Sequence, residues 1–334
     1  MRVLLDRHHA GLYHSMQLLG DRLGWDIYTP IGHEWWDEGY WSFGRWTWPD
    51  DRLAQQYLTI NDSWIRASEN LHWTKDSEFP DRWIYGITLD DAKRINEWNR
   101  WDLVIATLQD NQEGFARFAR EVGARYVYQV GNTGQQVNWG LDPVVLMASE
   151  MPMLGRGVYY HQPMDPIAFA EHTEIRSAAS FVNCMPDIAC WPLLRTAQER
   201  MPIAVHGIDG PDGVIKPLSR SIEIMGNVGW GWHDKIHGDG FGHVIHGWAA
   251  VGRPLIGHAS HYRGKMAEGL WVDGETCIDL DRHPVGEAVD IVLSMTPERH
   301  REMCRAIRAE FDRIDWEGEA EQIRELLMPQ AVAA

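Results

Sequence analysis

The sequence predicts an α/β protein made of two doubly wound units. Its 334 residues exceed one such unit of roughly 100 to 200 residues and suit two of them. In both halves, short apolar runs alternate with amphipathic segments, which is the pattern of parallel strands joined by helices. In the second half, a glycine-rich loop precedes a helical pattern and then another apolar run, the order found in ligand-binding α/β units.

The overall composition is that of a globular protein, with 44% hydrophobic and 24% charged residues. The net charge of −17 repels phosphate backbones and anionic lipid, which disfavours a nucleic-acid coat or a membrane-surface protein.

The four cysteines show no CxxC spacing and are too few for a disulfide scaffold. No signal-peptide pattern or long apolar run is present. We therefore expect a cytoplasmic protein, in the host cytoplasm if viral, without membrane insertion.

The first half begins with a short apolar strand at residues 3–5, a polar loop, and a helix whose apolar positions run from Leu12 to Leu23. Further strands are predicted at residues 25–28, 102–107 and 125–130, with an amphipathic helix at 115–122. Strand, helix and strand within about 30 residues imply a parallel crossover. We expect residues 1–165 to form the first doubly wound domain.

The second half repeats this alternation after Pro163 and Pro166 interrupt the pattern. Strands are predicted at residues 177–183, 202–206, 221–225 and 254–257, with a helix at 244–250. Thr296 is a predicted N-cap of a helix that presents Met303, Ile307 and Phe311 on one face. We expect a second domain at residues 166–312 and a C-terminal helical segment at 313–334.

The segment from residue 229 to 256 is the most informative part of the sequence. Its loop from Gly238 to Gly242 opens a helix, and glycines allow a backbone to approach a ligand closely. The free N–H groups and the dipole at a helix start favour an anion such as a diphosphate. Lys235 could add a positive charge to the same phosphates.

These residues resemble the donor half of GT-B glycosyltransferases. The shared pattern is an acidic residue, Asp239, followed by Gly240-Phe241-Gly242, a helix, and Gly252-x-Pro254 before a strand. It is similar to the mostly retaining group that includes glycogen synthases and mannosyltransferases. The resemblance implies two Rossmann-like domains that face each other across a cleft, with the first binding an acceptor and the second binding a nucleotide sugar. It also implies that the C-terminal helices cross back to the first domain.

The resemblance further implies a UDP-sugar as the most favoured donor and no required metal or other cofactor. Asp239 occupies the place of the acidic residue that contacts the donor sugar hydroxyls. A second glutamate normally follows eight positions later and holds the ribose, but this chain has Gly247 there, so His246 or Glu268 would have to substitute. The expected donor-binding residues are Gly11, Lys235, Gly240, Phe241, Gly242, His243 and His246.

Each of these assignments has a purely structural alternative. Gly240 and Gly242 could form only a tight turn. Lys235 could be a solvated side chain, and Asp239 could simply cap the helix that follows it.

The expected catalytic residues are His8, His9, Asp110 and Asp239. His8 and His9, like the nearby His14, follow the first strand at its carboxyl end, where open α/β sheets bind ligands. An imidazole there could act as a general base or stabilise charge on the leaving phosphate, and Asp110 is the other candidate base. The alternative is that each histidine lies on the surface or caps a helix.

Trp35, Trp36 and Trp41 lie in a tryptophan-rich segment and are the expected acceptor-binding residues, because aromatic rings stack on sugars and bases. The alternative is a hydrophobic lid that packs on its own domain. Three acceptor classes remain open: a glycan or lipid carrier, a small metabolite, and hydroxymethylated pyrimidine in DNA, as in phage-type DNA glycosyltransferases. The first 140 residues hold 14 basic and 20 acidic side chains, which counts against DNA.

Other functions are less well supported. His233 and His237, His243 and His246, and His258 and His261 have ligand-like spacings, but no carboxylate motif of a metallohydrolase accompanies them. No dinucleotide-binding fingerprint follows the first strand, which argues against a dehydrogenase. A non-catalytic sugar- or nucleotide-binding protein that keeps the fold is the remaining alternative, and Gly247 favours it.

Overall fold

The computed structural model describes residues 1–7, 9–32, 34–41, 73–132, 134–165, 167–169, 174–182 and 190–328. The chain divides into two compact units, one formed by Met1–Pro163 with the segment that begins at Trp316, and the other by Met164–Asp315. His8, one of the expected catalytic residues, lies outside the described residues. No helix in the described ranges is both long and apolar enough to cross a bilayer.

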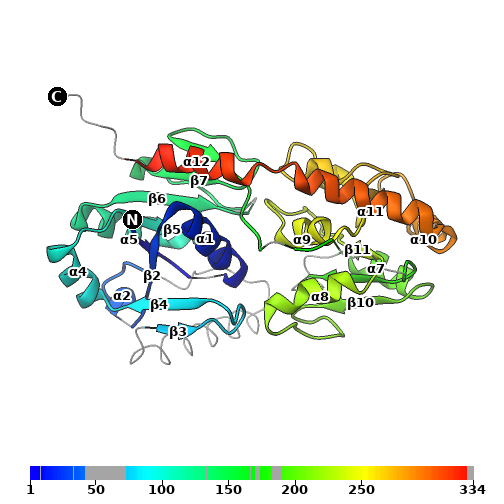
Figure 1. The fold of residues 1–334 in the computed structure, drawn as a ribbon, viewed down its shortest axis with the longest axis horizontal. Coiled ribbons are helices and arrows are strands. Elements are labelled where there is room, and N and C mark those ends of the chain that lie inside the picture. The colour runs from blue at the N-terminus through cyan, green and yellow to red at the C-terminus, as the bar shows by residue number, and fades with distance from the viewer. Residues whose placement is uncertain are drawn as a thin grey trace. The chain divides into compact units, whose positions relative to one another are not determined.

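The first unit contains a sheet in the order β3-β4-β2-β1-β5-β6-β7-β8 (Figure 1). Its strands are β1 (Arg2–Leu5), β2 (Asp26–Pro30), β3 (Trp73–Lys75), β4 (Trp83–Ile87), β5 (Leu103–Ala106), β6 (Arg125–Val130), β7 (Val144–Met147) and β8 (Gly157–Tyr159). All neighbouring strands pair in parallel except β3 with β4. The chain winds outward in both directions from β1 and β5, so their carboxyl ends mark the switch point where doubly wound sheets bind ligands.

The helices of this unit pack their apolar faces on the sheet. They are α1 (Ala10–Leu23), α2 (Glu34–Asp37), α4 (Leu89–Trp98), α5 (Gln112–Val122) and α12 (Trp316–Leu327), with short 3-10 turns η1 (Gln109–Asn111) and η2 (Trp139–Leu141). α5 ends at Gly123, which adopts φ +70°. Phe115, Phe118 and Val122 of α5 are buried in the core, as the helical spacing in the sequence predicted.

The C-terminal helix α12, red in Figure 1, packs against α1 and β8 of the first unit. The guanidinium of Arg125 donates to the Leu326 carbonyl at 3.0 Å, and that of Arg324 donates to the Arg22 carbonyl at 3.1 Å. The amide of His161 donates to the Glu319 carboxylate at 2.7 Å. These contacts make α12 part of the first unit although it follows the second in the chain.

The second unit contains a fully parallel sheet in the order β10-β9-β11-β12-β13. Its strands are β9 (Ala178–Phe181), β10 (Ile203–His206), β11 (Trp230–Trp232), β12 (Leu255–Gly257) and β13 (Cys277–Asp279). The winding direction reverses between β9 and β11, so the switch point lies at the carboxyl ends of those two strands. The prediction of a second doubly wound α/β sheet is confirmed.

Helices flank this sheet at α7 (Trp191–Gln198), α8 (Ser221–Gly226), α9 (His243–Val251), α10 (Val285–Ser294) and α11 (Pro297–Asp312), with 3-10 turns η3 (Leu218–Arg220), η4 (Ala259–Tyr262) and η5 (Glu268–Leu270). The hydroxyl of Thr296 accepts from the Arg299 amide and caps α11. Met303, Ile307 and Phe311 are buried on one face of α11. The cap and the apolar face of this helix are therefore as predicted.

The prediction of a strand at residues 221–225 is wrong, because this segment forms α8. Alternating Ile222 and Ile224 with polar residues over five positions fits a strand, but the segment is too short for its period to identify the element. The strand at this place in the sheet is β11, in which Gly231 lies between two buried tryptophans. A Cβ at Gly231 would lie 2.6 Å from the Trp248 ring, so glycine is required there.

Candidate donor site and acceptor surface

The glycine-rich loop, defined as residues 238–242, lies near the switch point of the second sheet. His233 directly follows β11, and the loop connects this strand end to α9. Gly238 and Gly242 have φ values of +66° and +76°, and a Cβ at Gly238 would meet the His261 carbonyl at 2.7 Å. The sequence therefore needs glycine at both ends of the loop to place it against the strand ends.

The first turn of α9 is suited to binding an anion. Gly242 is its N-cap and supplies no side-chain hydrogen bond, and no acidic residue occupies the first turn. The N–H groups there and the helix dipole consequently keep a positive potential that no carboxylate of the helix itself neutralises. Phosphate is among the anions that such a helix start binds.

Asp239 is held by two neighbouring side chains. Its Oδ2 lies 2.7 Å from His233 Nε2, and its Oδ1 accepts from Lys235 Nζ. Burial opposes ionisation of this carboxyl, but the Lys235 ammonium and the His233 imidazole outweigh it and hold the pKa of Asp239 well below its ordinary value. Asp239 is therefore a carboxylate whose negative charge is balanced by the Lys235 ammonium, and its side chain keeps 15% exposure.

Lys265 is a second cation at the loop and is not among the residues expected from the sequence. Its Nζ donates to the carbonyls of His237 and Asp239, both at 3.1 Å. The residue lies beyond β12, at the same edge of the sheet as the loop. Its position after a strand end was the available signal, since carboxyl ends of parallel strands share one edge.

Phe241 and His246 are packed inside the second unit. Phe241 is 0% exposed and His246 1% exposed, and their rings stack at 4.1 Å. His246 Nδ1 lies 3.1 Å from the Gly242 carbonyl. His243, which is partly exposed, lies edge-on to Phe241 at 5.2 Å. Phe241 and His246 thus fix the loop to α9, while His243 in the first helical turn is partly exposed, with its Nε2 buried.

Met225 packs against Gly247, the position at which the related pattern has its second glutamate. A Cβ at Gly247 would lie 3.2 Å from Sδ and Cε of Met225 in α8. His246 is buried, and Glu268 accepts from the Gly264 amide at 3.0 Å. His246 and Glu268, the two residues expected to replace the ribose-binding glutamate, therefore both make contacts within the protein.

Asp6 organises the switch point of the first sheet, a role that the sequence pattern did not indicate. Its carboxyl accepts from the amides of Thr107 and Leu108, from the Thr107 hydroxyl and from Asn111 Nδ2. Burial raises the pKa of Asp6 to about 6, although the four hydrogen bonds oppose that shift. This residue ties the end of β1 to the segment after β5.

The described residues of the loop after β1 have structural contacts. His9 is the N-cap of α1, and its Nδ1 accepts from the Leu12 amide at 3.2 Å. Gly11 lies in the first turn of the same helix. His14 is buried and stacks on Phe79 at 3.8 Å. The capping alternative considered for His9 is thus observed, although its side chain is exposed.

Asp110 borders an open depression of about 660 Å³ at the carboxyl edge of the first sheet. Its wall comes from the segments that follow β5 and β6, held together by Gln112, whose Nε2 donates to the Gln136 carbonyl at 2.8 Å. The lining residues are Gln109, Asp110, Gln112, Glu113, Gln136, Val137 and Asn138. Amides and carboxylates of this kind form hydrogen bonds with hydroxyl groups.

The three tryptophans expected to bind an acceptor lie in different environments. Trp35 is 0% exposed, and its Nε1 donates to the Ile87 carbonyl at 2.9 Å. Trp41 is 4% exposed and belongs to the same core, whereas Trp36 is 44% exposed. The ring faces of Trp35 and Trp41 are covered by the domain itself, as the alternative of a packed segment anticipated, and only Trp36 of the three offers a surface.

Comparison with known proteins places these features in a shared fold. No protein-family model matches the chain, and no curated protein sequence does. The structure of HepE from Anabaena in complex with UDP-glucose superposes with a TM-score of 0.60 at 12% identity, covering 98% of this chain and 99% of that one. Sucrose-phosphate synthase from Thermosynechococcus elongatus gives a TM-score of 0.61 at 11% identity, covering 98% of both chains.

The chain has the GT-B fold. The apo structure of WaaB, a lipopolysaccharide outer core galactosyltransferase, agrees, with a TM-score of 0.54 at 10% identity over 97% of this chain and 99% of that one. Two α/β sheets, nearly all of whose strands are parallel, are the basis of this GT-B likeness. The fold predicted from the Asp239 to Pro254 pattern is confirmed.

Proposed function

We propose that this GT-B protein is a glycosyltransferase that moves a sugar from a UDP-sugar to an acceptor hydroxyl. The observation that carries the proposal is the uncapped start of α9 behind the glycine-rich loop, at the switch point of the second sheet. Support comes from the GT-B structures of HepE, which were determined with UDP and with UDP-glucose. The diphosphate of the donor binds at the first turn of α9.

Lys235 and Lys265 supply positive charge at this site. Both ammonium groups contact the loop, Lys235 through the Asp239 carboxylate and Lys265 through two loop carbonyls. They stabilise the charge that develops on the departing UDP, a role that needs no metal ion. Asp239 positions Lys235 and presents its exposed edge to the donor sugar hydroxyls.

The acceptor is a glycan or a small hydroxylated molecule. The depression beside Asp110 carries two carboxylates, and no lysine or arginine is among its lining residues. This lining suits sugar hydroxyls and repels a phosphate backbone. The similar structures include a lipopolysaccharide outer core galactosyltransferase and a sucrose-phosphate synthase, and they give no support to DNA as the acceptor. Asp110 is the proposed general base for the acceptor hydroxyl.

A protein that binds a nucleotide sugar without turning it over is the second candidate. The packing of Met225 against Gly247 favours it, because a ribose-binding carboxylate is absent from that position. Turnover separates the two candidates. Slow release of UDP with water as the acceptor would mark an enzyme, whereas binding without release would mark a binding protein.

A donor and acceptor screen tests the proposal. Each UDP-sugar is first examined by thermal shift, since a ligand specific for the native state raises the melting temperature. UDP release is then measured with mono- and oligosaccharide acceptors and with modified duplex DNA. Lys235→Ala is expected to lower kcat/KM by about 100- to 1,000-fold, whereas Lys216→Ala, at an exposed site, leaves it unchanged. Failure of every UDP-sugar to bind would reject the proposal.

A further inference from the structure

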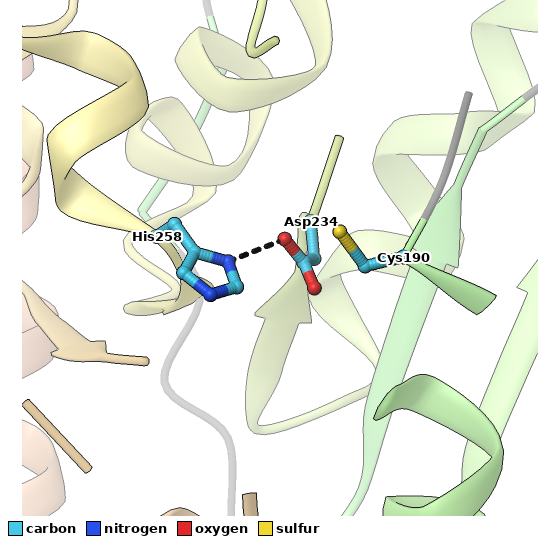
Figure 2. Close-up of side chains that lie close together, drawn as sticks. All are labelled: Cys190, Asp234 and His258. Atoms are coloured by element: carbon cyan, nitrogen blue, oxygen red, sulfur yellow. Dashed lines mark hydrogen bonds and ion pairs between the residues drawn. The ribbon is translucent and has the colours of Figure 1, made fainter. Parts of the chain in front are cut away.

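Three side chains with different metal-binding chemistry meet at the carboxyl edge of the second sheet. Cys190 is the N-cap residue of α7, Asp234 follows β11 by two residues, and His258 follows β12 directly. Figure 2 shows the Asp234 carboxyl between the imidazole of His258 and the thiol of Cys190. One ligand atom from each residue lies within 4.8 Å of the other two.

Asp234 has the geometry of a ligand that lacks its cation. Its side chain is 2% exposed, and its Oδ1 lies 2.7 Å from His258 Nδ1. Its Oδ2 is buried and, in the described part of the chain, has no hydrogen-bond partner other than the neighbouring thiol of Cys190. A thiol is a weak donor and compensates little for burying a carboxylate oxygen, so an additional positive group would stabilise this arrangement.

The backbone around the three residues is already organised. The amide of Cys190 donates to the Asp234 carbonyl at 3.1 Å, which fixes the start of α7 beside the end of β11. His258 stacks on His261 at 5.0 Å, so its ring plane is held as well. The histidine pair grouped by spacing in the sequence is thus a stacked pair, and Cys190 and Asp234 are the residues that join His258 in a cluster.

The donor set indicates which cation fits. Thiolate, imidazole and carboxylate together are typical of Zn²⁺, whereas Mg²⁺ and Ca²⁺ prefer sets made only of oxygens. We propose that Cys190, Asp234 and His258 bind one divalent transition-metal cation, with Zn²⁺ as the best match. Three protein ligands leave a fourth tetrahedral position for water or another ligand. On binding, the cation displaces the thiol proton and replaces the contact between Asp234 and His258.

Two other histidine contacts in the same unit provide matched controls. His283 contacts the carboxylates of Asp273 at 3.2 Å and of Glu287 at 3.0 Å, and Cys304 lies 3.5 Å from His300 Nδ1, but neither contact is part of a close group of three ligands among the described residues. Cys190, Asp234 and His258 form the only group of three or more such ligands with this spacing among the residues that the structure describes. Changes at His283 and Cys304 should therefore leave metal binding unaltered.

The experiment is a titration of the chelator-stripped full chain with Co²⁺ and then with Zn²⁺. We expect one equivalent of Co²⁺ per chain, with a near-ultraviolet thiolate charge-transfer band that Zn²⁺ removes by displacement. Cys190→Ser should abolish the band, and His258→Gln should weaken Co²⁺ binding by at least about tenfold, since even residues beyond the ligands change metal affinity by that much. His283→Gln and Cys304→Ser should retain both the band and the affinity.

The outcomes distinguish a site from a hydrogen-bonded cluster. Failure of the wild-type chain to take up stoichiometric Co²⁺ or Zn²⁺ would overturn the proposal, as would a charge-transfer band that survives in Cys190→Ser. Circular dichroism of each variant shows whether it is folded, and Cys190 and His258 are partly exposed, so their replacement is compatible with folding. The titration uses the metal alone and is therefore independent of glycosyltransferase activity.

Discussion

His233 Nε2 lies 2.7 Å from Oδ2 of Asp239 and joins the end of β11 to the glycine-rich loop. His233 is 0% exposed, so this contact is shielded from water and fixes the orientation of the carboxylate. The other oxygen of Asp239 accepts from Lys235. The histidine therefore controls where the lysine ammonium lies, through a carboxylate that both share.

Asp239→Asn should impair both folding and donor use. The amide carries no charge to balance Lys235. Its NH₂ group would also face either His233 or Lys235, each of which is a donor, so one hydrogen bond would be lost. We expect a loss of about 1 to 3 kcal/mol in the free energy of unfolding and a fall in kcat/KM for the UDP-sugar. Urea unfolding and initial rates measure the two effects. His233→Gln keeps a donor for the carboxylate and should be milder on both measures; equal or greater damage would contradict the role assigned to His233.

Gly242→Ala should weaken UDP binding beyond its cost in backbone strain. Gly242 and Gly274 both have φ +76°, a region that costs a residue with a Cβ about 1 to 2 kcal/mol. A Cβ at Gly242 would also lie 2.9 Å from Ile245 Cδ1, whereas nothing lies within 4 Å of one at Gly274. Calorimetric titration with UDP should show weaker binding for Gly242→Ala and wild-type binding for Gly274→Ala. The same Kd in both variants would mean that the loop does not contact the diphosphate.

Substitutions of Trp35 and Trp36 should separate core packing from acceptor binding. Trp35→Phe loses the hydrogen bond to the Ile87 carbonyl and core volume, so we expect about 1 to 3 kcal/mol less stability and an unchanged acceptor KM. Trp36→Ala, at a 44% exposed side chain, should change stability by less than about 1 kcal/mol and raise the acceptor KM. Urea unfolding and acceptor kinetics check both. A raised acceptor KM in a fully folded Trp35→Phe variant would show instead that Trp35 contributes to acceptor binding.

The local sequence pattern correctly predicted helices that have both a regular spacing of apolar residues and a recognisable capping residue. Thr296 at the start of α11 and Gly123 at the end of α5 carry caps as well as apolar periodicity, and both helices have the predicted faces. β11 was not predicted, because glycine is uncommon inside strands. The reason for glycine at position 231 is the close approach of the Trp248 ring, which is distant in sequence. Residues 221–225 alternate like a strand, but packing between α8 and α9 makes them helical.

The site was predicted less completely than the fold. The helix start at residue 243 and the roles of Gly238 and Gly242 follow from local chemistry, because glycine and a helix N-terminus act where they stand in the chain. Lys265 and Asp6 act on segments distant in sequence, so only the folded structure shows their partners. The burial of Trp35 likewise depends on Ile87 and Phe118, which lie far along the chain.

Asp6 should make the stability of the first unit depend on pH between about 4 and 7. Its pKa is 3.8 in an unfolded chain and is raised to about 6 by burial in the folded one. The folded state therefore binds the proton more tightly, so the stabilisation is complete below the unfolded pKa and is lost as pH rises through the folded pKa. A shift of about two pKa units corresponds to about 3 kcal/mol.

The Asp6→Asn variant isolates this effect because an amide does not titrate. The unfolding free energy of the wild type minus that of Asp6→Asn should fall by about 2 kcal/mol from pH 4 to pH 7, because the rest of the effect lies below pH 4. Urea unfolding at a series of pH values measures it, followed by hydrogen exchange of the β1 and β5 amides to confirm that the first unit is being reported. A difference that stays constant or grows with pH would show that the four donors to Asp6 outweigh its burial, so that the carboxylate is the preferred folded form.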